Sequence, residues 1–126
     1  MALRTPLGAV RGQGSARSGT RHFWRQRLTA IANVPLTIGF VLLVVANLGG
    51  DYEAVRGALS SPLAALVLLA FVLSGVYHMR LGLQVIIEDY VHGEGLKFAC
   101  LIANTLFSAA LALICLFAIL KLAVGG

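Results

Sequence analysis

The sequence predicts an all-α integral membrane protein, a three-transmembrane-helix bundle with its N-terminus on the cytoplasmic side. Hydrophobic residues make up 59% of the 126 residues, whereas charged residues make up only 12%. The apolar residues are gathered into three runs, each at least as long as the ~20 residues needed to span a hydrocarbon core. Arginines cluster before the first run, and such clusters are typical of segments on the cytoplasmic side of a membrane.

Residues 1–22 are expected to form a basic, flexible cytoplasmic tail, because glycine, serine and arginine dominate without sustained periodicity. An alternative is a mitochondrial transit peptide, since residues 1–20 contain arginine and serine but no acid. The remaining residues, 23–126, form the membrane anchor domain. The net charge of +5 does not indicate nucleic-acid binding, because no basic stripe interleaved with aromatic residues accompanies it.

The first span is expected over residues 28–48, which contain no charged residue. Pro35 lies inside it, where a lipid-embedded helix tolerates a kink. A loop carrying Asp51, Glu53 and Arg56 follows. Six arginines precede the span and Arg56 alone lies in this loop, so the N-terminus is predicted inside and the loop outside.

The second and third spans are expected over residues 62–87 and 98–124, joined by an inner loop. Ser61 followed by Pro62 predicts a capped helix start. The second span is apolar at first and then becomes polar, with Tyr77, His78, Arg80 and Gln84. The third span is apolar apart from small polar residues, which suit contact between helices in lipid: Asn104, Thr105 and Ser108.

His78 indicates a functional site, because an ionisable residue at membrane depth is costly. It lies ~15 Å along the helix from Glu88 at the inner interface. It is either a histidine hydrogen-bonded to a neighbouring helix, part of a proton relay, or an axial haem ligand. A relay is disfavoured because no further acid or histidine lies at depth. Haem is favoured by small neighbours that would let a flat macrocycle approach: Gly82, Ser74 and Gly75.

A six-coordinate haem needs two axial ligands, and this chain offers only one histidine at depth. The second ligand would therefore come from another polypeptide. Arg80 lies on a different helix face, with Gln84 and Glu88, and three roles stay open: pairing with a partner's acid, a proton path, or snorkelling to the interface. Asp89 and Tyr90 fall at the inner membrane edge, where Tyr90 is either a hydrogen-bond donor to a quinone carbonyl or an interfacial aromatic residue.

Residues 77–92 resemble the H-x3-G-x6-D-Y signature of the small hydrophobic membrane anchor subunit of succinate dehydrogenase (complex II), in its α-proteobacterial type. His78, Gly82, Asp89 and Tyr90 supply this signature. Arg27 begins a stretch similar to the R-x-T-A-I start of that family's first helix. The resemblance covers roughly residues 22–120 and includes the number, length and spacing of the spans.

The resemblance implies that this chain pairs with a cytochrome b anchor subunit, and that one histidine from each holds a haem b, with His78 as the ligand here. It also implies that Arg27 lies near the haem propionates and that Tyr90, beside Asp89, hydrogen-bonds ubiquinone. Electrons would come from succinate through the flavoprotein and iron–sulfur subunits, so the chain does not catalyse alone. The expected location is the bacterial inner (plasma) membrane rather than the mitochondrial inner membrane. Alternatives are a fumarate reductase anchor and a haem-free structural or assembly protein.

Overall fold

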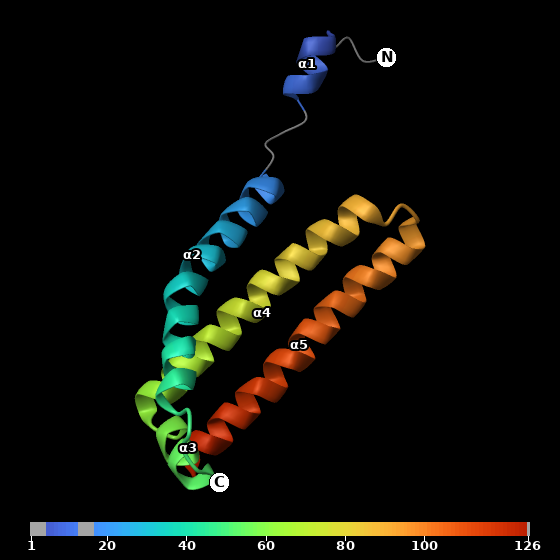
Figure 1. Cartoon of the computed structure of the whole chain (residues 1–126). Helices are drawn as coiled ribbons and strands as arrows, with labels where there is room; N and C mark the ends of the chain where they lie inside the picture. Colours follow the sequence, from blue (N-terminus) through green and yellow to red (C-terminus); the bar gives the residue numbers. More distant parts are fainter. Residues whose placement is uncertain (1–4, 13–16, 126) are drawn as a thin grey trace.

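The computed structural model describes residues 5–12 and 17–125, and all regular structure in these ranges is helical. The helices are α1 (Pro6–Arg11), α2 (Arg17–Ala46), α3 (Tyr52–Leu59), α4 (Pro62–Tyr90) and α5 (Glu94–Val124), as shown in Figure 1. Three of them, α2, α4 and α5, are long and apolar enough to cross a membrane. The predicted all-α class with three transmembrane helices is therefore confirmed.

The central helix is α4, which packs against both α2 and α5 (Figure 1). Within the described ranges, α2 and α5 do not contact each other. The buried residues are few and lie on α4 and α5: Ala64, Ala65, Leu81, Asn104, Ser108 and Ile119. Many large apolar side chains are exposed instead, as expected for helices whose outer surfaces meet lipid or another membrane subunit.

The helix ends follow local capping chemistry. The Ser61 hydroxyl accepts a hydrogen bond from the Ala64 backbone N–H at 3.3 Å, and Pro62 is the first helical residue, so the predicted start of the second span is confirmed. α2 ends at Ala46, two residues before the predicted end of the first span. Gly49, with φ of 79°, then turns the chain in a left-handed conformation that glycine adopts readily.

The prediction of a loop between the first two spans was wrong in part, because this segment contains the short helix α3. The Asp51 carboxylate caps this helix by accepting a hydrogen bond from the Ala54 N–H at 2.9 Å. Glu53 lies in its first turn and Arg56 in its last, which complements the helix dipole. The charged residues attributed to a loop therefore stabilise the two ends of a helix.

The helices also extend beyond the predicted spans. α1 and the first six residues of α2, which begins at Arg17, fall within residues 1–22, where no regular structure was expected. Extending an existing helix costs less than starting a new one, which accounts for the added turns of α2. α4 continues to Tyr90 and α5 begins at Glu94. The parts of the predicted tail at residues 1–4 and 13–16 lie outside the described residues.

Candidate functional site

His78 is half-buried in the middle of α4 and is tied to α2 by a side-chain hydrogen bond. Its Nδ1 atom lies 2.9 Å from the Oγ1 atom of Thr29. Thr29 comes 49 residues earlier in the chain. A histidine hydrogen-bonded to a neighbouring helix was one of the sequence-based interpretations, and this contact is present. It does not exclude ligation, because it uses only one of the two ring nitrogens.

The surroundings of Thr29 favour a proton on the Nδ1 atom of His78. The Thr29 hydroxyl oxygen lies 2.8 Å from the carbonyl oxygen of Arg25 and 3.0 Å from that of Gln26. Carbonyl oxygens only accept, so these two short contacts favour donation of the single hydroxyl proton to a carbonyl. The hydroxyl oxygen then accepts from a protonated His78 Nδ1, which leaves Nε2 with a free lone pair. This is the arrangement of metal-binding histidines, whose other ring N–H is held by a nearby acceptor.

The small residues near His78 have different surroundings. A Cβ atom added to Gly75, almost one turn from His78, would meet nothing within 4 Å, so the helix surface is open there. A Cβ atom added to Gly82 would lie 3.6 Å from the Gln26 side-chain nitrogen, and Ser74 donates a 3.5 Å hydrogen bond to the Thr29 carbonyl. The structure therefore leaves open space at Gly75, whereas Gly82 and Ser74 face α2.

The donor set on this chain fits a haem better than a bare metal ion. Over residues 5–12 and 17–125, no three His, Cys, Asp or Glu side chains gather where they could hold a metal ion. A haem iron takes its equatorial ligands from the macrocycle and needs only axial ligands from protein. One half-buried histidine with a free Nε2 and an open helix surface nearby is consistent with that requirement.

The other predicted site residues lie at one end of the helix bundle, near the start of α2 and the end of α4, and apart from His78. Arg27 is exposed on α2, and its guanidinium carbon lies 5.2 Å from the centre of the Phe23 ring. Asp89 and Tyr90 are exposed at the C-terminal end of α4. Twelve residues of helix place Tyr90 about 18 Å along the axis from His78. The structure therefore brings Thr29, rather than Arg27, Asp89 or Tyr90, into contact with His78.

Thr29 was not singled out by sequence reasoning as a partner of His78. The available signal was a polar residue near the start of the first apolar run, within the stretch that begins at Arg27. The pairing itself needs the tertiary contact between α2 and α4.

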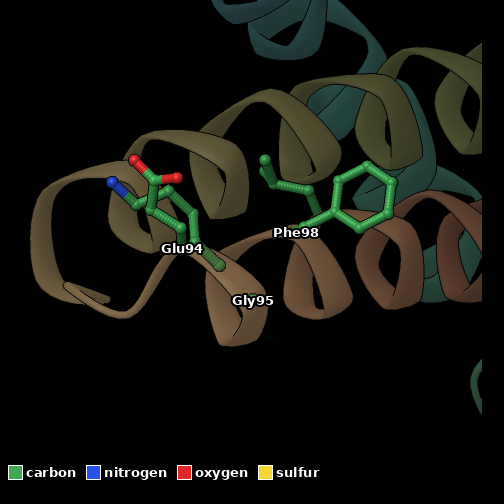
Figure 2. Close-up of a pocket in the computed structure, with 5 residues that line it drawn as sticks. Glu94, Gly95 and Phe98 are labelled. Carbon is green, nitrogen blue, oxygen red and sulfur yellow. The ribbon is translucent and has the colours of Figure 1, made fainter.

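The surface at the start of α5 is also hollowed, but none of the predicted site residues lines this hollow. Figure 2 shows Glu94, Gly95 and Phe98 on the first turns of α5. Together with Lys97 and Leu101 they line a hollow of about 490 Å³. All five residues belong to one helix, so the hollow is a patch on the outer surface rather than an enclosed site.

A second hollow, of about 300 Å³, lies between α2 and α4 and is rich in positive charge. It is lined by Arg21, His22, Arg25, Arg80, Leu81 and Gln84. Sequence reasoning identified Arg80 as an anomaly but did not connect it to the arginines of α2. The spacing of Arg21 and Arg25, four residues apart on one helix face, was the signal that was present.

The chain is similar to one family throughout its length. A family model described as the succinate dehydrogenase/fumarate reductase transmembrane subunit matches residues 1–122. A relative from Rickettsia bellii, named succinate dehydrogenase hydrophobic membrane anchor subunit, is 35% identical over 84% of this chain and 85% of its own. A relative of the same name from Paracoccus denitrificans is 31% identical over 99% of this chain and 96% of its own. No solved structure matches significantly. The predicted resemblance to α-proteobacterial anchor subunits is confirmed.

Proposed function

This chain belongs to the succinate dehydrogenase/fumarate reductase transmembrane subunit family, and on that basis we propose that it is the hydrophobic membrane anchor subunit of a bacterial succinate dehydrogenase. It would share a haem b with a cytochrome b anchor subunit and contribute to a ubiquinone site. The iron–sulfur and flavoprotein subunits would bind at the end of the bundle that carries Tyr90 and deliver electrons from succinate. Its relatives carry the anchor name, which supports this assembly.

The observation that carries the haem proposal is the hydrogen bond between Thr29 and His78. It would hold the imidazole in place and keep the lone pair of Nε2 available to iron. A b-type haem bound there would supply a one-electron redox centre between the two anchor subunits. His78 binds it, Thr29 orients His78, and Arg27 is the candidate partner for a propionate.

The quinone proposal rests on Tyr90 and Asp89 at the end of α4. Both side chains are exposed, so they are available to a lipid-soluble ligand at the membrane surface. The Tyr90 hydroxyl would donate a hydrogen bond to a quinone carbonyl and so stabilise the negative charge that develops on this oxygen during reduction. The remainder of the quinone site belongs to the partner subunits.

The proposed orientation places the N-terminus, Asp89 and Tyr90 on the cytoplasmic face of the bacterial inner membrane. Six arginines precede the first apolar run, which supports this side as the inside. A soluble dehydrogenase that docks in the cytoplasm would then lie beside the quinone-binding end of α4.

The haem proposal is tested on the complex purified in mild detergent from its native membrane. We expect the three other subunits to co-purify and the reduced complex to show a b-type α-band. His78→Ala should abolish this band while the subunits still co-purify. His92→Ala is the matched control, because His92 is an exposed histidine after the end of α4, and it should leave the band intact. An unchanged band in His78→Ala would contradict the proposal and favour a haem-free anchor.

A fumarate reductase anchor is the second candidate, because the matching family model includes fumarate reductase subunits. The two candidates are distinguished by the type of quinone in the source membrane and by which direction of the reaction is faster. Ubiquinone with faster succinate oxidation would support the first candidate, whereas menaquinone with faster fumarate reduction would support the second.

A further inference from the structure

We propose that the basic hollow between α2 and α4 is a binding site for the phosphate of an anionic phospholipid headgroup. Three of its residues come from α2 and three from α4: Arg21, His22 and Arg25, and Arg80, Leu81 and Gln84. Its volume, about 300 Å³, accommodates a phosphodiester with part of a glycerol headgroup. No carboxylate is among the described residues that line it, so its three arginines have no balancing negative charge within the lining.

Hydrogen-bond donors are in excess in this hollow. The Arg80 Nη2 atom lies 3.4 Å from the Thr105 hydroxyl oxygen, a long contact that occupies one of five guanidinium N–H groups. His22 Nε2 is buried without a hydrogen-bond partner in the described structure. Gln84 donates its amide to the Glu88 carboxylate at 3.0 Å, and Glu88 is not among the residues that line the hollow. Phosphate oxygens would supply the missing acceptors.

The location of the hollow favours a lipid as the source of the phosphate. Gln84 lies six residues, or about 9 Å along the helix, from the end of α4 at Tyr90. The exposed aromatic side chains of Phe23 and Trp24 are in the same turns of α2 as Arg21 and Arg25, as expected at a membrane interface. Basic pockets between transmembrane helices at this depth suit the headgroups of anionic lipids. An acyl chain can then follow the exposed apolar surface beside the hollow.

None of the candidate haem residues His78, Thr29 and Arg27 lines the hollow. Gln26 and Thr29 mark the side of α2 that faces α4. At 100° per residue, Arg25 and Arg27 lie on opposite flanks of that side. Arg25 lines the hollow, whereas Arg27 is not among its lining residues. The proposal therefore depends only on membrane insertion and assigns Arg80 a role that neither haem nor quinone binding requires.

The test uses the intact complex after detergent exchange has removed bound lipid. Phosphatidylglycerol, phosphatidylcholine and inorganic phosphate are each added, and bound lipid is counted by native mass spectrometry alongside the unfolding temperature. We expect phosphatidylglycerol to bind and raise the unfolding temperature, with phosphatidylcholine and inorganic phosphate without effect at equal concentration. Arg80→Gln should weaken phosphatidylglycerol binding about fivefold or more, because one arginine contact near a lipid phosphate is lost.

Arg56→Gln is the matched control, because Arg56 lies on α3 at the opposite end and its Nη2 atom is 3.4 Å from the Gly125 carbonyl oxygen. It should bind phosphatidylglycerol as the native chain does. If Arg80→Gln fails to assemble, Arg25→Gln removes a second charge from the same hollow at an exposed position. Equal binding of both lipids, unchanged affinity in the assembled variant, or equal stabilisation by inorganic phosphate would each overturn the proposal. A shifted haem spectrum with unchanged lipid binding would assign the hollow to the propionates instead.

Discussion

The two halves of the α2–α4 pair are joined by different kinds of contact. In the polar half (residues 17–33 and 74–90), Thr29 meets His78 and Ser74 through hydrogen bonds. In the apolar half (residues 34–46 and 62–73), the Phe40 and Phe71 rings stack in parallel with centroids 4.6 Å apart. The apolar half holds the helices together by packing, which leaves side chains of the polar half free to be arranged for ligands.

The apolar half also brings the two backbones close. A Cβ atom added to Gly39 would lie only 3.2 Å from a methyl carbon of Val67, so the glycine allows a close approach. Small residues serve this purpose between membrane helices, where van der Waals packing replaces the hydrophobic effect. The comparison predicts that changes in the polar half alter ligand binding, whereas changes in the apolar half alter stability.

The largest effect is expected from Thr29→Val, which removes the acceptor for His78 Nδ1 while keeping the side-chain shape. Loss of such a supporting hydrogen bond typically lowers metal-site affinity by 10- to 100-fold. This loss is measured by the haem retained after dilution and by the low-spin electron paramagnetic resonance signal of the haem iron. Thr29→Ser should restore both, and Thr37→Val, an exposed threonine on the same helix, should change neither. A normal haem signal in Thr29→Val would remove the orienting role from Thr29.

The next effect is expected from Tyr90→Phe, which deletes the hydroxyl proposed to bind the quinone. The rate of quinone reduction should fall about tenfold, equivalent to about 1.4 kcal/mol for one lost hydrogen bond. Succinate oxidation measured with a soluble dye should not change. Tyr52→Phe is a close control, because Tyr52 is 74% exposed at the other end and Tyr90 is 76% exposed. Equal loss of both activities in Tyr90→Phe would indicate faulty assembly rather than a quinone contact.

A smaller effect, of a different kind, is expected from Phe71→Ala in the apolar half. Loss of the stacked pair should lower the stability of the assembled complex by about 1 kcal/mol. A thermal unfolding curve measures this, and the haem spectrum should be native at low temperature. Phe117→Ala, which removes a ring 70% exposed on α5, provides the comparison variant. A changed haem spectrum in Phe71→Ala would break the proposed division between the halves.

The smallest effect is expected from Ser74→Ala. Its hydroxyl donates to the Thr29 carbonyl at 3.5 Å, the longest of the hydrogen bonds between α2 and α4 in the described residues. Hydrogen bonds between membrane helices average about 0.6 kcal/mol, so the change in stability should stay below that value. A thermal shift larger than that of Phe71→Ala would show that polar contacts, rather than packing, hold the pair together.

The sequence predicted the three spans well because membrane helices leave long apolar runs, and it predicted the start at Ser61 because capping is local. It missed α3 because Asp51, Glu53 and Arg56 are as frequent in loops as at helix ends. α2 begins at Arg17, before the predicted span, and no apolar run marks its first residues because they are polar and glycine-containing.

The candidate site was only partly predictable. His78 stood out because an ionisable residue interrupts an apolar run. Its bond to Thr29 joins residues 49 positions apart and follows from how α2 lies against α4, which no local pattern contains. The basic hollow likewise combines arginines from two helices. Sequence reasoning found the unusual residues, and the tertiary arrangement determined their neighbours.

The central position of α4 also has a consequence for biogenesis. α2 is synthesised before α4 and has no contact with α5 in the described structure, so it has no helix of this chain to pack against until α4 follows. During that interval its polar face, with Gln26, Thr29 and Asn33, lacks the neighbour that covers it in the finished chain. We therefore expect α2 to remain beside the insertion machinery or the second anchor subunit until α4 arrives.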